Sequence, residues 1–325
     1  MRRTTFWIGV PLLLILLIGV AVAVGAIPLS LVDVARGLVG EGDPTAVAII
    51  HTLRLPRAIL AALVGAGLGM AGAALQGSLR NPLAEPYLLG VSGGAAVGAV
   101  LAVAVGISAT GMLPLAAFVG AGAAIVAALL VARAAGGRAD PRILLMAGVV
   151  IGAFANAAIM VALAGAPTNM IRGAMWWMMG SVSDASWPGI AWLAAYTLLG
   201  GALLLRYARD IDILALGEEP AAALGLDVDR AGRRIFLVSA LLAAATVAAA
   251  GLIGFVGLVV PHLVRAAGIR RHRPLLAGAA LVGATLVVGA DVAARTLRPP
   301  SELPLGAVTA MLGVPFFLTQ LRRLA

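Results

Sequence analysis

The amino-acid sequence predicts an all-α, polytopic membrane protein with about ten transmembrane helices and both termini in the cytoplasm. The first observation is composition. Hydrophobic residues make up 62% of the 325 positions, charged residues make up 11%, and the mean hydropathy is +1.07. A soluble domain is only about half apolar and about a quarter charged. The second observation is a succession of apolar stretches of about 20 residues, each long enough to cross a bilayer.

The predicted spans are apolar runs that end at charged or turn-forming residues. Their approximate ranges are 6–25, 56–79, 87–106, 113–134, 142–165, 189–206, 234–251, 255–267, 274–295 and 305–321. We expect the first span to be retained, because its apolar run exceeds the core of a signal peptide and many spans follow. The eighth span is too short to cross about 30 Å of hydrocarbon alone, which predicts a half-helix packed within the protein.

The distribution of arginine predicts the orientation. With the N-terminus inside, most of the 23 basic residues, all of them arginine, lie in cytoplasmic segments. The outer side then holds only Arg36, Arg54, Arg57, Arg172, Arg295 and Arg298. This asymmetry follows the positive-inside rule and supports the number of spans.

Several classes of site are excluded by residue counts. The chain has no Cys, which excludes disulfides, thiolate metal sites and a cysteine nucleophile. It has no Lys, so it cannot carry an ordinary Walker A site for ATP. The three His are far apart in sequence, which argues against a metal centre. No basic face with interleaved aromatic residues points to nucleic acid.

The second span carries small residues at every fourth position. Gly65, Gly69, Ala73 and Gly77 form one stripe along a helix. Such stripes let helix backbones approach closely in lipid. We expect this stripe to be a tight packing surface.

The predicted spans contain few ionisable residues. Asp291 is the main exception, and Arg295 follows it by one helical turn, so we expect a local ion pair. An ion-coupled secondary transporter of a small solute usually needs intramembrane carboxylates or His. The sequence favours transport driven by a separate energy-supplying subunit. The alternative hypotheses are an ion-coupled secondary transporter and a membrane-embedded enzyme.

Such a subunit requires a docking surface, and the longest cytoplasmic segment, 206–234, offers one. Pro220 suits the first turn of a short helix, Glu218 and Glu219 favour its positive end, and Gly225 can end it. The residues alone leave two readings open: a docking helix, or a loop helix without a partner.

The sequence resembles the FecCD-type family, the permease subunits of type II ABC importers for iron-siderophores, haem and vitamin B12. In the first half, the matching stretches are Arg-Leu-Pro-Arg from Arg54, Arg-Asn-Pro-Leu-Ala-Glu-Pro from Arg80, Leu-Leu-Gly-Val-Ser-Gly-Gly-Ala from Leu88 and Met-Gly-Ser from Met179. In the second half, they are Ala-Leu-Gly-Glu-Glu from Ala215, Gly-Phe-Val-Gly-Leu-Val-Val-Pro-His from Gly254, Ala-Asp-Val-Ala-Ala-Arg from Ala290 and Glu-Leu-Pro-Leu-Gly-Ala-Val-Thr-Ala from Glu302. They follow one another along nearly the whole chain.

The resemblance implies one permease domain over 1–325 that forms a homodimer in the bacterial or archaeal inner membrane. It also implies two ATPase subunits, which would bind ATP and Mg²⁺, and a periplasmic or lipid-anchored binding protein. This chain would hold no cofactor. The cargo would be a metal chelate: an iron-siderophore first, then vitamin B12 or haem. A coupling helix within 215–228 would contact the ATPase through Leu216, Gly217, Glu218, Glu219, Ala221, Ala222, Leu224 and Gly225.

The resemblance also implies roles on the outer face and along the pathway. Arg54, Arg57 and Arg295 would dock carboxylates of the binding protein; the alternatives are interfacial anchoring or, for Arg295, the pair with Asp291. The cytoplasmic gate would be formed by Asn81, Pro82, Leu83, Asp140 and Pro141. For Asn81-Pro82 a plain helix stop is the alternative. The pathway would be lined by Met146, Val150, Phe154, Asn156 and Met160.

Overall fold

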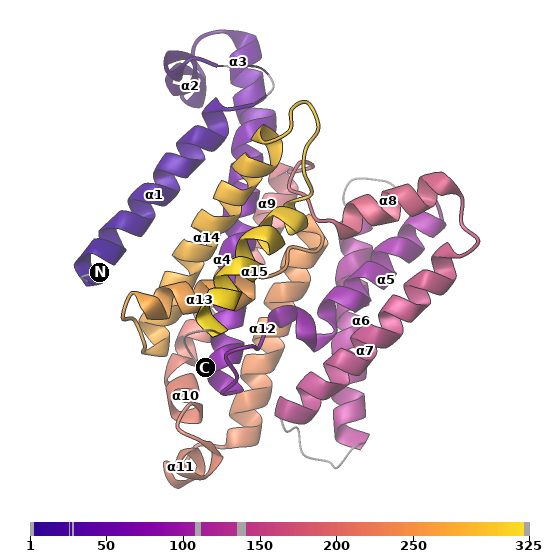
Figure 1. Cartoon of the computed structure of the whole chain (residues 1–325), viewed down its shortest axis with the longest axis vertical. Helices are drawn as coiled ribbons and strands as arrows, with labels where there is room; N and C mark the ends of the chain where they lie inside the picture. The colour runs from indigo at the N-terminus through magenta and orange to yellow at the C-terminus, as the bar shows by residue number, and fades with distance from the viewer. Residues whose placement is uncertain (1–2, 26, 28, 108–111, 135–140, 322–325) are drawn as a thin grey trace.

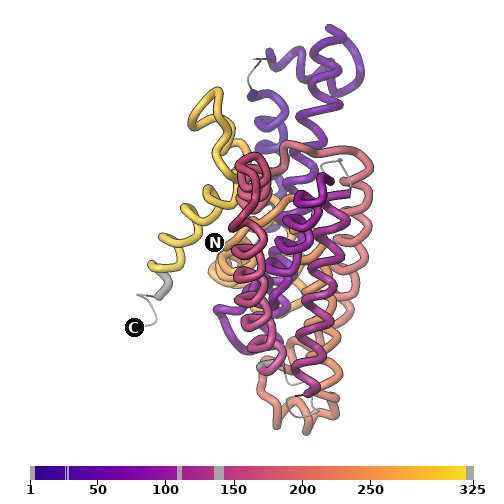
Figure 2. The backbone as a smooth tube through the Cα atoms, turned by 90° about the vertical axis from the view of Figure 1, so that its right-hand side faces the viewer, coloured from indigo at the N-terminus to yellow at the C-terminus, as the bar shows by residue number. Residues whose placement is uncertain are grey.

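The computed structural model is a bundle of helices whose long axes run mostly in one direction (Figures 1 and 2). The structure describes residues 3–25, 27, 29–107, 112–134 and 141–321. Within these ranges, seven helical stretches are long and apolar enough to cross a membrane: Thr4–Ala23, Pro44–Ser78, Met112–Ala134, Ile143–Leu163, Trp187–Arg206, Val228–Ala250 and His272–Thr296. The shorter apolar helices are Val91–Ala104, Val256–Ala266 and Leu305–Thr319. The prediction of a polytopic all-α membrane protein is confirmed.

The helices are labelled as in Figure 1. The spanning helices are α1 (Arg3–Ala23), α4 (Leu55–Ser78), α6 (Met112–Ala134), α7 (Pro141–Leu163), α9 (Trp187–Arg206), α12 (Val228–Ala250) and α14 (His272–Thr296). The shorter apolar helices are α5 (Val91–Ala104), α13 (Val256–Ala266) and α15 (Leu305–Leu321). The remaining elements are α2 (Leu31–Leu38), α3 (Pro44–Ile49), the π-turn η1 (Ile50–Arg54), the 3₁₀ turn η2 (Pro86–Leu89), α8 (Thr168–Met178), α10 (Ala208–Leu214) and α11 (Glu218–Ala223).

Helix α4 is the centre of the bundle. It packs against α14, α12, α13 and α9, while α5, α6 and α7 form a second group beside α12 (Figure 1). The predicted small-residue stripe explains the closest of these contacts. A Cβ atom on Gly65 would collide with the carbonyl group of Gly283, and one on Gly69 with the carbonyl oxygen of Ala279. Helices α4 and α14 therefore touch backbone to backbone, as the stripe predicted.

The third predicted span, 87–106, is wrong as one continuous helix. Residues Pro86–Leu89 form a 3₁₀ turn, and Gly90 then takes a left-handed conformation with φ of +76° before α5 begins. A side chain at Gly90 would also meet the carbonyl oxygen of Gly148 on α7. Because α5 has 14 residues, it is about 21 Å long and does not cross the hydrocarbon layer alone.

The eighth predicted span is confirmed as a half-helix. Helix α13 has 11 residues, and its first turns from Val256 to Pro261 are buried. The chain enters it through residues 251–255, which are not helical. Gly251 and Phe255 in this segment have φ of +69° and +67°. Irregular backbone of this kind is tolerated in a membrane protein where the protein itself surrounds it.

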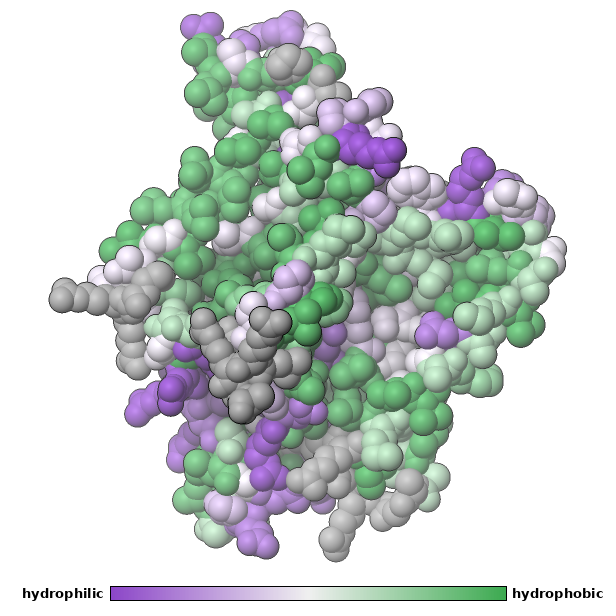
Figure 3. Space-filling view, viewed as in Figure 1, coloured by the Kyte–Doolittle hydropathy of each residue, from purple (hydrophilic) through white to green (hydrophobic). Residues whose placement is uncertain are grey.

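The two ends of the molecule differ from its middle. In Figure 3, hydrophilic residues gather at the end that holds α10 and α11, and a broad hydrophobic band lies between this end and the opposite one. The opposite end carries α2, α3 and α8 (Figure 1). On the predicted orientation, α10 and α11 lie in the cytoplasm.

Candidate functional site

The predicted short helix of the longest cytoplasmic segment is present as α11. Gly217 precedes it with φ of +122°, and Pro220 lies in its first turn beside Glu218 and Glu219. Gly225, with φ of +81°, ends it, and the N–H groups of Gly225 and Leu226 donate to the carbonyl oxygens of Ala222 and Ala221. The start and stop residues thus act as the sequence predicted.

The surface around α11 is apolar and exposed. Leu216 and Leu224, on either side of the helix, are each 63% exposed, whereas Ala221 is buried. Two exposed leucines beside a pair of carboxylates form a small surface suited to a partner protein. Docking of an ATPase at this surface stays a prediction.

Helix α10, which leads into α11, is tied to the membrane core. The Asp212 carboxylate accepts hydrogen bonds from the His272 backbone N–H at 3.0 Å and lies 2.7 Å from His272 Nδ1. His272 begins α14 and is buried, and its ring packs over Gly77 of α4, where a side chain would collide with it. No local sequence pattern predicts this contact, because 60 residues separate its partners.

Arg80 connects α11 to the end of α4. Its guanidinium donates to Glu218 Oε1 at 3.2 Å. The Arg80 backbone is left-handed, with φ of +49°, directly after the last turn of α4. Its side chain is therefore directed differently from one in a continuing helix.

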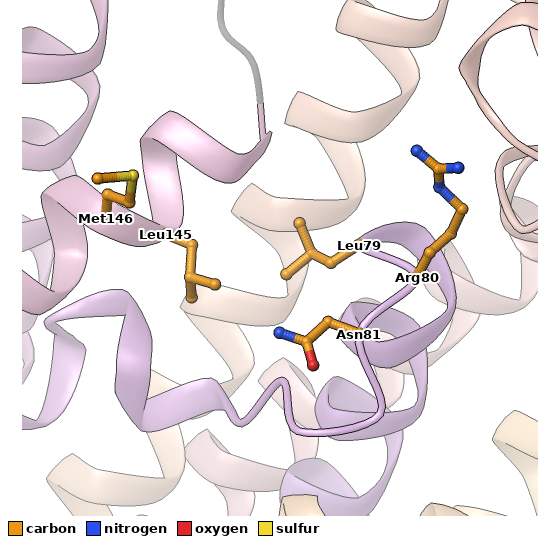
Figure 4. Close-up of a pocket in the computed structure, with 5 residues that line it drawn as sticks. All are labelled: Leu79, Arg80, Asn81, Leu145 and Met146. Carbon is orange, nitrogen blue, oxygen red and sulfur yellow. The ribbon is translucent and has the colours of Figure 1, made fainter.

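The turn that follows α4 lines a hollow of about 450 Å³. Its walls are Leu79, Arg80 and Asn81 from the end of α4 and Leu145 and Met146 from α7. In Figure 4, Asn81 points toward Leu145, and the Arg80 side chain extends to the other side, away from Met146. The Asn81 side chain also accepts the Leu83 N–H at 2.9 Å, which holds the turn.

The structure thus places a predicted gate residue, Asn81, and a predicted pathway residue, Met146, in the walls of the same hollow. Pro82 and Leu83 follow in the exposed turn. Asp140 lies outside the described residues, and Pro141 is described only as the first residue of α7. The gate role of all five residues stays a prediction.

The predicted pathway residues share one side of α7. Met146, Val150, Phe154, Asn156 and Met160 are all exposed. On the other side of α7, Leu144, Ala147, Ala155 and Ile159 are buried against the chain's own helices. Helix α7 therefore presents a mostly apolar face that this chain does not cover, which suits a lipid, a second copy or a translocation pathway.

The predicted docking arginines lie at the opposite end, where each is bonded within the chain. Arg57 donates to both Asp291 oxygens from Nε at 3.0 and 3.2 Å. Its Nη1 and Nη2 donate to the two oxygens of Glu302 at 2.8 and 2.9 Å. The expected Asp291–Arg295 ion pair is also present, at 3.5 Å. Arg57, from a distant part of the chain, is the closer partner of Asp291.

Arg54 and Arg295 bind the end of α1. Arg54 Nη1 donates to the carbonyl oxygens of Val22 and Ala23 at 2.8 and 2.7 Å, and its Nη2 donates to that of Ile27. Arg295 donates to the carbonyl oxygens of Ala21 and Val24, both at 2.7 Å. The last carbonyl groups of a helix lack partners within it, so these two side chains complete α1. Docking at these arginines stays a prediction.

Glu302 is the exposed member of this outer arginine cluster (Arg54, Arg57, Asp291, Arg295 and Glu302). Its side chain is 44% exposed, whereas that of Asp291 is 2% exposed. The hydrogen bond from Arg57 lowers the pKa of the Glu302 carboxyl. Glu302 is therefore ionised at neutral pH and holds the loop before α15 against α4.

Sequence reasoning also missed two side chains that hold the irregular segment before α13. Glu85 accepts the Phe255 N–H, and the Tyr87 hydroxyl accepts the Ile253 N–H, each at 2.8 Å. The one local signal is a lone Glu between the predicted spans 56–79 and 87–106. Among the described residues, no three His, Cys, Asp or Glu side chains come together to hold a metal ion.

Comparison with known proteins identifies the family. The sequence profile of the FecCD transport family matches residues 12–323. The chain belongs to the FecCD transport family. It is therefore a membrane-spanning permease subunit of an ABC importer, and an ion-coupled secondary transporter is not favoured.

Individual members of the FecCD family differ in cargo. The chain is 43% identical over 281 residues to the cobalamin import system permease of Halobacterium salinarum, covering 86% of this chain and 74% of that protein. It is 35% identical over 331 residues to the Fe(3+)-citrate import system permease of Bacillus subtilis, covering 99% and 98%. A solved structure described as an inward-facing conformation of a metal-chelate type ABC transporter has a TM-score of 0.88 and 30% identity, with 99% of this chain and 100% of that chain covered.

Proposed function

We propose that this FecCD-family permease imports a bulky metal chelate across the cytoplasmic membrane of a bacterium or archaeon. Ferric chelates such as siderophores lead the proposed cargo, followed by vitamin B12 and haem. The observation that carries the proposal is the similarity over 99% of the chain to a metal-chelate type transporter. The relatives named for cobalamin and ferric citrate agree with a large chelated metal rather than a bare ion.

The pathway would lie between two copies of the chain. The exposed face of α7 around Val150 and Phe154 supports this arrangement, because an apolar face that one copy leaves uncovered can be completed by a second. Its lack of charged side chains suits a pathway that binds cargo weakly. The hollow between Asn81 and Met146 would be its cytoplasmic end.

Energy would come from two ATPase subunits that hold ATP and Mg²⁺, and α11 would be their docking helix. The exposed Leu216 and Leu224 support this role, as does the absence of the Walker A lysine from the chain. A binding protein would deliver the chelate at the outer end. For its carboxylates to engage Arg57, they would compete with Glu302, the exposed internal partner.

Uptake into proteoliposomes tests the proposal. The vesicles contain the chain with its ATPase and its binding protein, hold ATP on the ATPase side, and are offered ferric siderophore, cobalamin or haem. We expect ATP-dependent accumulation of one chelate. The variant Glu218→Arg/Glu219→Arg should abolish it, because reversed charge at the start of α11 opposes the helix dipole and alters the docking surface.

Two results would contradict the proposal. One is solute flux driven by an ion gradient through the chain alone, which would favour a secondary carrier. The other is accumulation that the double charge reversal leaves unchanged, which would remove α11 from the coupling step.

A further inference from the structure

Two polar contacts of different kinds link helices α10 and α11 to the membrane-spanning helices. The Asp212–His272 contact fixes the preceding helix α10 to α14 and α4. The Arg80–Glu218 ion pair instead reaches the turn that follows α4. That turn lines the hollow opposite α7 (Figure 4). The first contact joins α10 to buried residues of α14 and α4, and the second joins α11 to the turn at the hollow.

Three local features converge on the Arg80–Glu218 pair. Arg80 has a left-handed backbone, and its side chain extends to the side away from Met146 (Figure 4). Gly217 has no side chain, and a Cβ there would lie 3.4 Å from Arg80 Nη1. Glu218, the first residue of α11, receives the guanidinium. A left-handed backbone is conformationally costly for arginine, and Gly217 has a φ of +122° that residues with a side chain rarely adopt, so their combination indicates a built contact.

Stability does not account for this contact. The two side chains are 36% and 57% exposed, and an exposed ion pair contributes about 0–1 kcal/mol. A cation beside the N-terminus of a helix is also opposed by the helix dipole. The pair instead fixes a position. It holds Glu218, the first residue of α11, against Arg80 and therefore close to the turn that contains Asn81.

We propose that the Arg80–Glu218 pair transmits movement of α11 to the turn at 79–83, so that the cytoplasmic hollow opens and closes in step with the docked ATPase. This inference rests on the proposed function. Arg80 acts as a positioning residue: it belongs to the turn, contacts Glu218 of α11, and moves Asn81 relative to Met146. The pair stays joined during the movement, as a rigid link.

A double-mutant cycle tests the link in the complete complex. Uptake per ATP hydrolysed is measured for the native chain, Arg80→Gln, Glu218→Gln and the double variant. Controls are Arg209→Gln and Asp229→Asn, which neutralise exposed residues on α10 and α12. We expect Arg80→Gln to lower uptake per ATP by about threefold or more while the ATPase stays bound, and the double variant to be no worse than the poorer single variant.

Either of two results overturns the link: uptake per ATP at the native level in Arg80→Gln, or losses in the two single variants that multiply in the double. If the native complex and the Arg209→Gln control show no ATP-driven uptake, the proposed function fails instead. The two failures are therefore distinguishable.

Because the chain has no Cys, a second measurement is direct. In Arg80→Cys/Glu218→Cys, a short reducible thiol cross-linker replaces the ion pair by a covalent one. A rigid link predicts that uptake, lowered in the unlinked double variant, rises on cross-linking and falls again on reduction. Cross-linking that stops uptake would show that the two residues must separate, and would overturn the inference.

Discussion

The two ends of this permease use the same chemical pair, arginine and carboxylate, in opposite settings. At the outer end, Arg57 is 13% exposed and binds both Asp291, at 2% exposed, and Glu302. At the cytoplasmic end, the side chains of Arg80 and Glu218 are 36% and 57% exposed and lie 3.2 Å apart. Burial, rather than residue type, separates the two sites.

Because of this difference in burial, the outer cluster stabilises the fold, whereas the inner pair mainly positions α11. A buried charge that loses its partner keeps its desolvation cost, so breaking the outer arginine cluster strongly destabilises the fold. An exposed pair loses little when it breaks, because water replaces the partner. The outer cluster therefore fixes α1, α4, α14 and the loop before α15 as one unit, whereas the inner pair can be placed on a part that moves.

Breaking the outer arginine cluster should lower the stability of the chain most. Arg57→Met leaves the Asp291 carboxylate buried with only the longer contact to Arg295. We expect the free energy of unfolding to fall by about 3–5 kcal/mol. The matched change Arg80→Met at the inner pair should cost about 1 kcal/mol or less. Thermal unfolding in detergent, followed by tryptophan fluorescence, compares the two; equal losses would remove the distinction drawn from burial.

A smaller effect is expected at the end of α1. Arg54→Gln removes the donors that reach the carbonyl oxygens of Val22, Ala23 and Ile27. Buried carbonyl groups left without donors should cost about 1–3 kcal/mol. Hydrogen exchange should accelerate in the last turn of α1 while α14 stays protected. Unchanged exchange at α1 would show that Arg295 alone holds this end.

Glu302 combines the two settings, because it is an exposed carboxylate bound to an arginine that is largely buried. In Glu302→Gln, Arg57 keeps Asp291, so we expect a loss of about 1 kcal/mol or less. Proteolysis within the loop before α15 should nevertheless become faster, since the loop loses its contact with α4. A loss as large as that of Arg57→Met would mean that exposure of the carboxylate does not lower its contribution.

The smallest expected effect is that of pH on the Glu302 contact. Its folded pKa is lowered by the hydrogen bond from Arg57, so its contribution is complete above its unfolded pKa and is lost as pH falls through the lower folded value. Between about pH 6 and pH 8 the difference in melting temperature between the native chain and Glu302→Gln should stay constant. A difference that changes across this range would place another titrating group in the cluster.

Local sequence patterns predicted the parts of the molecule that local physics determines. Apolar runs marked the spans, Gly225 marked the end of α11, and the four-residue spacing marked the Asp291–Arg295 pair. The patterns failed where the local structure depends on a residue that is distant in the sequence. Gly90 breaks the third span because α7 approaches it, and Arg57 reaches Asp291 across 234 residues. Neither contact leaves a periodic signal in the sequence.

The backbone contact between Gly65 and Gly283 has a mechanical consequence. Two helices separated by side chains can slide while rotamers readjust, but carbonyl groups pressed against Cα atoms have no rotamers with which to yield. Helices α4 and α14 thus form a rigid pair. We therefore expect the structural changes of a transport cycle to occur outside this contact, in parts such as the short helices α5 and α13 and the turns at their ends.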